Sequence, residues 1–233
     1  MSRTFSSKIN TQAVLDFSPL NPTVKRHLVY VYTTLFGTLL AGTAGCLAHL
    51  VYNVGGLLTL LGGFILIALL AFTPHSPDTV AKRLSFLFLF GFFEGASIGP
   101  FVNAILALDP MIVVQALAGS VCIFGCFSGS ALLAARRSML YLGGFLSSAL
   151  SLSLLLSFVN LFARSEALYS VQIYFGLLLF CGFVMFDTQI MVEKANLGNT
   201  DFIWHSLELF LDFVNIFVRI MQILAKNKKR DNK

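Results

Sequence analysis

The chain has 233 residues, of which 57% are apolar, and it carries only 16 basic and 11 acidic side chains. A soluble domain contains about 25% charged residues, so the 12% found here is too small to cover a water-soluble globule. The mean hydropathy of +0.82 agrees with an all-α membrane protein. The net charge of +5 does not indicate nucleic-acid binding, because five of the basic residues lie in 226–233. A basic tail of this kind is typical of contact with anionic lipid or an acidic protein patch.

Apolar runs predict the helices in chain order, at about 20 residues for each membrane crossing. No acidic or basic residue occurs between Leu28 and Pro77, and the only break there is Asn53–Gly56. The runs are continuous and do not alternate in polarity, which argues against a β-barrel. The predicted spans are 28–51, 56–73, 84–107, 111–135, 139–162 and 168–190, and a seventh segment covers 202–224.

These spans divide the chain into three parts. Residues 1–27 form an N-terminal segment, residues 28–224 a seven-helix membrane domain, and residues 225–233 a basic C-terminal tail. The four cysteines lie inside apolar runs without CxxC spacing, so neither a disulfide framework nor a zinc site is indicated. We expect no cofactor.

Basic residues flanking the spans predict the orientation in the membrane. Counted over the first six spans and their loops, nine lie on the side of the N-terminus and only Arg164 lies on the other side, so the N-terminus is expected to be cytosolic. The seventh segment leaves two alternatives open, because a full crossing would move the basic tail to the opposite side and a re-entrant segment would not. The nine residues are Arg3, Lys8, Lys25, Arg26, Lys82, Arg83, Arg136, Arg137 and Lys194.

The seventh segment carries a stripe of polar residues spaced three or four apart, which places them on one helical face. Either the stripe faces water on a helix lying at the membrane surface, or it lines an aqueous path inside a bundle. A surface helix usually has a lysine-rich polar face and fewer aromatic residues, so we favour the path. The stripe consists of His205, Glu208, Asp212, Asn215, Arg219 and Gln222.

Asp187 near the end of the sixth span is the second indication of a polar interior. It lies seven residues, about 10 Å by helical rise, inside Lys194, while Glu208 lies about 10 Å and Asp212 about 16 Å inside Asp201. A carboxylate at this depth is costly without a partner or water, so Asp187 is expected to pair with Asp212, with Glu208 as the rival partner. Such a pair shares one proton and can bind Ca²⁺ at higher pH. Peptide-bond hydrolysis by the pair, or simple capping of the sixth span by Asp187, are the alternatives.

Glu94 is a further acid, in the middle of the third span. The Gly, Ser and Pro residues that follow it up to Pro100 are expected to open the helix and free carbonyl groups. Alternatively, a protonated Glu94 donates a hydrogen bond to a neighbouring helix. The histidines have no metal-ligand spacing.

Four motifs resemble those of the Bax inhibitor-1 family, over about 25–225 of this chain: 73–76 (TPHS), 94–100 (EGASIGP), 186–189 (FDTQ) and 209–215 (LFLDFVN). The resemblance implies six helices around a central seventh. It also implies an endoplasmic-reticulum protein that suppresses cell death and leaks Ca²⁺ through a pH-sensitive di-aspartate gate, here Asp187 with Asp212. Bacterial relatives have an arginine before the third span that engages this pair, for which Arg83 is the candidate. Glu208, Asn215 and Arg219 are supporting candidates, and Glu94 is an accessory one.

Three functions follow as hypotheses. The first is a non-enzymatic Ca²⁺ leak channel or exchanger, with Asp187 and Asp212 as Ca²⁺ ligands. The second is a scaffold in the endoplasmic-reticulum membrane that binds cell-death regulators or other membrane proteins without transport. The third is an intramembrane aspartyl protease, against which stands the absence of the Gly-x-Gly-Asp signature at both aspartates.

Overall fold

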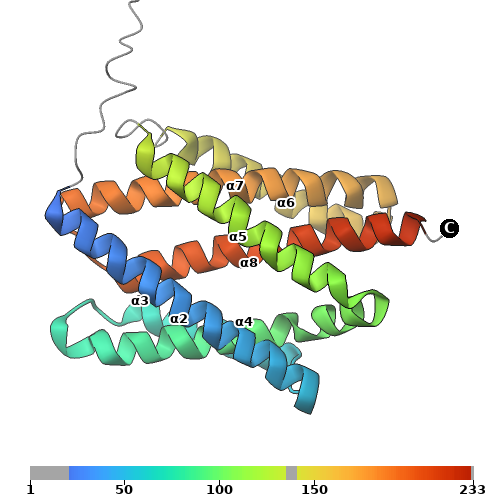
Figure 1. Cartoon of the computed structure of the whole chain (residues 1–233), viewed down its shortest axis with the longest axis horizontal. Coiled ribbons are helices and arrows are strands. Elements are labelled where there is room, and N and C mark those ends of the chain that lie inside the picture. The colour runs from blue at the N-terminus through green and yellow to red at the C-terminus, as the bar shows by residue number, and fades with distance from the viewer. Residues whose placement is uncertain (1–20, 135–140, 232–233) are drawn as a thin grey trace, which may run out of the picture.

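The computed structural model describes residues 21–134 and 141–231. Within these ranges the chain is all-helical, as predicted, and contains no strand (Figure 1). The predictions made for Arg3, Lys8, Arg136, Arg137 and Lys233 lie outside the described residues. The elements are α2 (Pro22–Tyr52), α3 (Leu57–Phe72), the 3-10 turn η1 (Pro77–Thr79), α4 (Val80–Leu108), α5 (Pro110–Leu133), α6 (Leu142–Ala163), α7 (Glu166–Asn196) and α8 (Phe202–Asp231).

Local chemistry explains where several of these helices begin. Asn21 caps α2 through its side chain, and Pro22 follows at a position where its missing N–H costs nothing. Asp109 and Pro110 repeat this arrangement at α5, where the Asp109 carboxylate accepts a hydrogen bond from the Met111 N–H at 2.9 Å. A comparison of the bounds shows that each predicted span corresponds to one helix. Four of the seven described helices, α2, α4, α7 and α8, are longer than the predicted apolar runs.

Five stretches are long and apolar enough to cross a membrane: α2, η1 with α4, α5, α6 and α7. The apolar helix α3 is shorter, at 16 residues. Helix α8 is long enough, with 30 residues, but acidic and basic side chains interrupt its apolar sequence. This composition is that of a multi-pass membrane protein with one polar-striped helix.

Helix α8 runs antiparallel to α7 through the middle of the bundle (Figure 1). It packs against α2, α4, α5 and α7, whereas α3 packs only against α4 and α6 only against α7. Four helices therefore surround α8. The prediction placed six helices around it, but α3 and α6 lie outside this ring. The acids of the α8 stripe are consequently enclosed by protein.

The two ends of α8 lie at opposite ends of the bundle. We call the end that carries the N-termini of α2, α4 and α8 the proximal end, and the other the distal end. At the distal end the Lys228 ammonium lies 3.0 Å from the Asp109 carboxylate. Helix α8 thus traverses the whole bundle, as the full-crossing alternative requires.

The basic tail is part of this helix, because α8 continues to Asp231 and residues 225–231 do not form a separate segment. This placement changes the charge balance on which the orientation was predicted. Among the described residues, five basic side chains lie near the proximal end (Lys25, Arg26, Lys82, Arg83, Lys194) and five near the distal end (Arg164, Lys226, Lys228, Lys229, Arg230).

Glycines bring α2 and α4 into close contact. A Cβ atom added at Gly95 would lie 1.8 Å from the Gly42 carbonyl oxygen, and one at Gly45 would lie 1.9 Å from the Phe92 carbonyl oxygen. Gly91, Gly95 and Gly99 recur every four residues on α4, the pattern that allows helix backbones to approach closely in lipid. The α2–α4 pair therefore forms a rigid wall beside α8.

Helix α4 remains helical through Pro100, which corrects the expectation that it opens after Glu94. The Ser97 hydroxyl donates to the Phe93 carbonyl at 2.8 Å and lies 2.9 Å from the Thr59 hydroxyl of α3. Pro100 has no N–H to bond the Ala96 carbonyl, and that oxygen packs instead against Gly55. Packing from neighbouring elements thus keeps the helix intact.

Candidate functional site

Asp187 of α7 and Asp212 of α8 meet across the contact between these two helices, as predicted. Their carboxyl groups lie close enough to interact directly. Asp212 is only 4% exposed, and Asp187 is half-buried. Two carboxyl groups this close, which we call the dyad, can share one proton in a hydrogen bond.

Glu208 lies one turn before Asp212 on the same face of α8. Its Oε1 atom accepts a hydrogen bond from the indole N–H of Trp204 at 2.8 Å, and its charge is felt at Asp187. Its Oε2 atom and the Oδ2 atom of Asp212 are buried without a hydrogen-bond donor among the described residues. Two carboxylate oxygens therefore have acceptor capacity left for a proton, a water molecule or a cation.

A chain of hydroxyl groups connects α7, α5 and α2. Thr188, next to Asp187 in sequence, is fully buried, and its Oγ lies 3.3 Å from Ser128 Oγ of α5. Ser128 in turn shares a hydrogen bond with the Tyr32 hydroxyl of α2. Polar contacts thus link α7 to two helices of the bundle besides α8.

A charged cluster, which we call the latch, closes the proximal end of α8. The two terminal nitrogens of Arg83 donate to the two oxygens of Asp201, each at 2.8 Å. Asp201 also accepts from the Trp204 backbone N–H at 3.2 Å and so caps α8. His75 Nδ1 accepts a further bond from Arg83 at 2.8 Å. The latch therefore ties the start of α4 to the start of α8.

The latch corrects the role expected of Arg83, which does not engage the dyad but pairs with Asp201. Burial acts to raise the pKa of Asp201, but the hydrogen bonds from Arg83 and from the Trp204 N–H outweigh it and hold that pKa below its usual value. Asp201 thus remains a carboxylate at neutral pH. The latch and the dyad are chemically distinct, although one α8 segment joins them.

The first residue of the polar stripe, His205, faces α2 and not α7. Its Nδ1 atom lies 3.0 Å from Nε2 of His27, and both rings are buried. Asn215 donates to the carbonyl of Leu211 in its own helix at 2.9 Å. The polar residues of α8 therefore have different partners. His205 contacts α2, Asn215 bonds within its own helix, and Glu208 and Asp212 lie on the side of Asp187.

The remaining candidates lie away from the dyad. Glu94 is half-buried on α4, which does not contact α7, so the structure does not bring it to Asp187. Arg219 lies two turns beyond Asp212 and contacts α7 at Gly176, where an added Cβ would be 2.8 Å from its Nε. No group of three or more His, Cys, Asp or Glu side chains converges as a metal site in the described residues.

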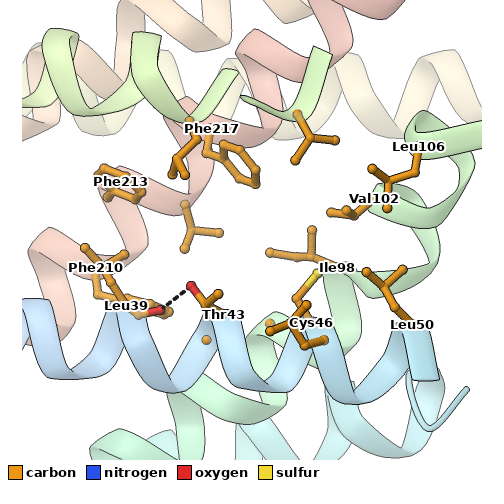
Figure 2. A pocket seen from close by; sticks show the side chains of 16 residues that line it. Leu39, Thr43, Cys46, Leu50, Ile98, Val102, Leu106, Phe210, Phe213 and Phe217 are labelled. Carbon is orange, nitrogen blue, oxygen red and sulfur yellow. Dashed lines mark hydrogen bonds between the residues drawn. The ribbon is translucent and has the colours of Figure 1, made fainter. Parts of the chain in front are cut away.

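A cavity of about 370 Å³ lies among α2, α4, α5 and α8 (Figure 2). Figure 2 shows apolar side chains around it, among them Phe210, Phe213 and Phe217 of α8. The one hydroxyl group at its wall, that of Thr43, donates to the Leu39 carbonyl at 2.9 Å. The cavity faces a different side of α8 from the dyad and offers no polar group to an ion.

Comparisons with known proteins agree with the motifs in this site. A family model described as an inhibitor of apoptosis-promoting Bax1 matches residues 24–229. Bax inhibitor 1 of Homo sapiens is 45% identical over 231 residues, covering 98% of this chain and 98% of the human protein. Bax inhibitor 1 of Mus musculus is 46% identical with the same coverage. The chain belongs to the Bax inhibitor 1 family.

The Bax inhibitor 1 match extends over all seven helices and includes both residues of the dyad. The family reaches beyond animals, since Bax inhibitor 1 of Arabidopsis thaliana is 44% identical over 214 residues, which cover 91% of this chain and 85% of the plant protein. The resemblance inferred from the motifs is therefore confirmed. The matched names describe an inhibitor of apoptosis and carry no enzymatic activity.

Proposed function

We propose that this protein suppresses cell death as a proton-regulated Ca²⁺ leak channel or exchanger of the endoplasmic-reticulum membrane, with its N-terminus in the cytosol. The observation that carries the proposal is the close approach of Asp187 of α7 and the buried Asp212 of α8. Membership in a family of apoptosis inhibitors supports the cell-death part. Residues 28–224 act as the transporting domain.

The protonation state of the dyad determines whether α7 and α8 are held together. With one proton, the two carboxyl groups share a hydrogen bond across the helix contact and the path is closed. A second proton removes the shared charge and weakens that bond, so acidification loosens the contact. Loss of the remaining proton leaves two like charges, which repel each other and bind a hard cation more tightly.

The acids near the dyad give the proximal half of the path its preference for cations. Glu208 and Asp212 lie one turn apart on α8, and both interact electrostatically with Asp187 on α7. The Oε2 atom of Glu208 and the Oδ2 atom of Asp212 have no hydrogen-bond donor in the described structure. Oxygen ligands of this kind suit Ca²⁺, which is the transported ion and not a resident cofactor.

Reconstitution of the purified protein into lipid vesicles tests the proposal. We expect Ca²⁺ flux from wild-type protein and a loss of most of that flux in Asp212→Asn. Asp78→Asn is the matched control, because Asp78 is an exposed acid in η1 and lies outside the dyad. Its flux should equal that of the wild type.

The other two hypotheses give different results in the same vesicles. A scaffold without transport gives no Ca²⁺ flux from any folded variant. An aspartyl protease cleaves a membrane-embedded peptide, and Asp212→Asn abolishes that cleavage. Either result contradicts the proposed leak.

A further inference from the structure

A half-buried arginine lies on the polar stripe of α8, beyond the dyad. Arg219 is seven residues after Asp212, which places it on the same helical face about 10 Å further along the axis. Both residues face α7, Asp212 through Asp187 and Arg219 through Gly176. A path that follows this face of α8 past the dyad therefore meets the guanidinium group of Arg219.

The charge of Arg219 is not neutralised by a carboxylate. Its nearest hydrogen-bond partner is the neutral amide of Gln222, whose Oε1 lies 3.5 Å from its Nη1. The Tyr169 hydroxyl of α7 is close enough to interact with it electrostatically. Among the residues that the structure describes, no acidic side chain forms an ion pair with Arg219.

Arg219 also lies well inside the distal end of α8. The Lys228–Asp109 ion pair marks the distal end of the bundle, and Arg219 is nine residues, about 13 Å, inside it. Gly176 leaves room for the guanidinium directly against the α7 backbone. A charge is costly at this depth, and such residues usually face a bundle interior or a water-filled cavity.

The stripe thus changes sign along its length. Its proximal half carries the acids Glu208 and Asp212, and its distal half carries Arg219 and Lys226. The Lys226 ammonium donates to the Ser170 hydroxyl of α7, so it also faces this helix. A cation that leaves the dyad toward the distal end moves from a negative into a positive segment.

We propose that Arg219 is an electrostatic barrier in the distal half of the path, which limits the rate of cation passage and sets the ratio of divalent to monovalent flux. The inference rests on the proposed leak function and adds a selectivity residue to it. Fixed positive charges in pores repel cations by the same physics. The acids attract the ion, and Arg219 keeps the leak slow.

A charge barrier has a signature that a steric plug lacks. The Coulomb energy of the barrier is proportional to the charge of the passing ion. The factor by which the barrier slows the flux of a divalent ion is therefore the square of the factor for a monovalent ion. A barrier that slows K⁺ about fivefold therefore slows Ca²⁺ about twenty-five-fold. A steric plug acts through the size of the ion, and its effect does not scale with the ionic charge.

The test compares Ca²⁺ and K⁺ flux in vesicles for variants that change only this charge. Arg219→Gln removes the charge and Arg219→Lys retains it. Gln222→Glu leaves Arg219 in place but provides a carboxylate where its amide acceptor now lies. Arg164→Gln is the matched control, because it removes an exposed arginine at the distal end outside the path.

We expect Arg219→Gln and Gln222→Glu to raise Ca²⁺ flux about tenfold or more, and to raise it by about the square of the rise in K⁺ flux. Arg219→Lys and Arg164→Gln should stay within about twofold of the wild type, because neither changes the charge in the path. Equal rises for both ions overturn the barrier and indicate a plug.

Failure of this inference differs from failure of the proposed function. If the wild type leaks Ca²⁺ and Asp212→Asn does not, while the charge variants at 219 and 222 leave both fluxes unchanged, the barrier is wrong and the leak function stands. If the wild type and Arg219→Gln are folded and neither leaks Ca²⁺, the leak function is wrong and the barrier falls with it.

Discussion

The latch between Arg83 and Asp201 gives a stability prediction whose size follows from the structure. Arg83→Gln removes both 2.8 Å hydrogen bonds to Asp201. Breaking one partner of a buried ion pair costs about 3–5 kcal/mol. Arg83 is 3% exposed and Asp201 18% exposed, so water compensates part of the loss. We therefore expect a destabilisation of about 3 kcal/mol, which is at the low end of that range.

Equilibrium unfolding in mild detergent measures this change, and the chain provides its own probe. Trp204 is the only tryptophan in the sequence, and its indole and backbone N–H groups both lie beside the latch. A double-mutant cycle of Arg83→Gln with Asp201→Asn should give a coupling free energy of about 2 kcal/mol. As a control, Arg164→Gln on the exposed surface should change stability by less than about 0.5 kcal/mol.

The latch should also resist acid, because the pKa of Asp201 is lowered. A carboxyl group with a lowered pKa stabilises the fold above its ordinary value of about 3.9, and that stability is lost only as the pH falls through the lowered value. The carboxyl group of Asp201 should therefore stay charged between about pH 5 and about pH 8. A coupling free energy below about 0.5 kcal/mol at neutral pH would refute this account of the latch.

Two further predictions concern helix packing. Gly95→Ala places a methyl group against the Gly42 carbonyl and should destabilise the protein by about 2–3 kcal/mol. The control Gly125→Ala, whose added methyl group meets open space, should be neutral or slightly stabilising. Equal effects of the two variants in thermal unfolding would contradict the close α2–α4 contact. A cysteine pair at 187 and 212 should crosslink more readily than one at 187 and 208, and the reverse order on non-reducing gels would mean that Glu208 is the partner of Asp187.

Much of the helix order could be predicted from the sequence, because long apolar runs interrupted by Asn53–Gly56 or Asp109–Pro110 leave few alternatives. That Asp187 meets an acid of the α8 stripe could also be predicted, since consecutive antiparallel helices joined by a short loop bring Asp187 level with that stripe, and the motifs of the family point to Asp212. Both predictions depend on the spacing of residues along the chain, which can be read directly from the sequence.

The partner of Arg83 could not be predicted in this way. Asp201 lies 118 residues from Arg83, and only the packing of α4 and α8 brings them together. The course of α4 through Pro100 was missed for a related reason, because contacts with Thr59 and Gly55 from other elements support it. Interactions between distant segments are absent from local patterns.

The glycine repeat at 91, 95 and 99 is visible in the sequence. Its four-residue spacing is the signal that identifies a close helix contact. The course of α8 is different, since the sequence allows both a full crossing and a re-entrant segment. The structure shows one continuous helix whose distal end carries the Lys228–Asp109 ion pair, and no local pattern in the sequence indicates this contact.

The most direct test of the proposed mechanism is the pH profile of Ca²⁺ flux from vesicles that contain wild-type, Asp187→Asn or Asp212→Asn protein. Each variant is first shown to be folded by the fluorescence of Trp204. Asparagine at either position removes one titratable group and the shared proton, so the Ca²⁺ flux that remains in either variant should depend less on pH than the wild-type flux does. If both folded variants keep the wild-type pH profile, the dyad is not the proton sensor and the proposed gate is wrong.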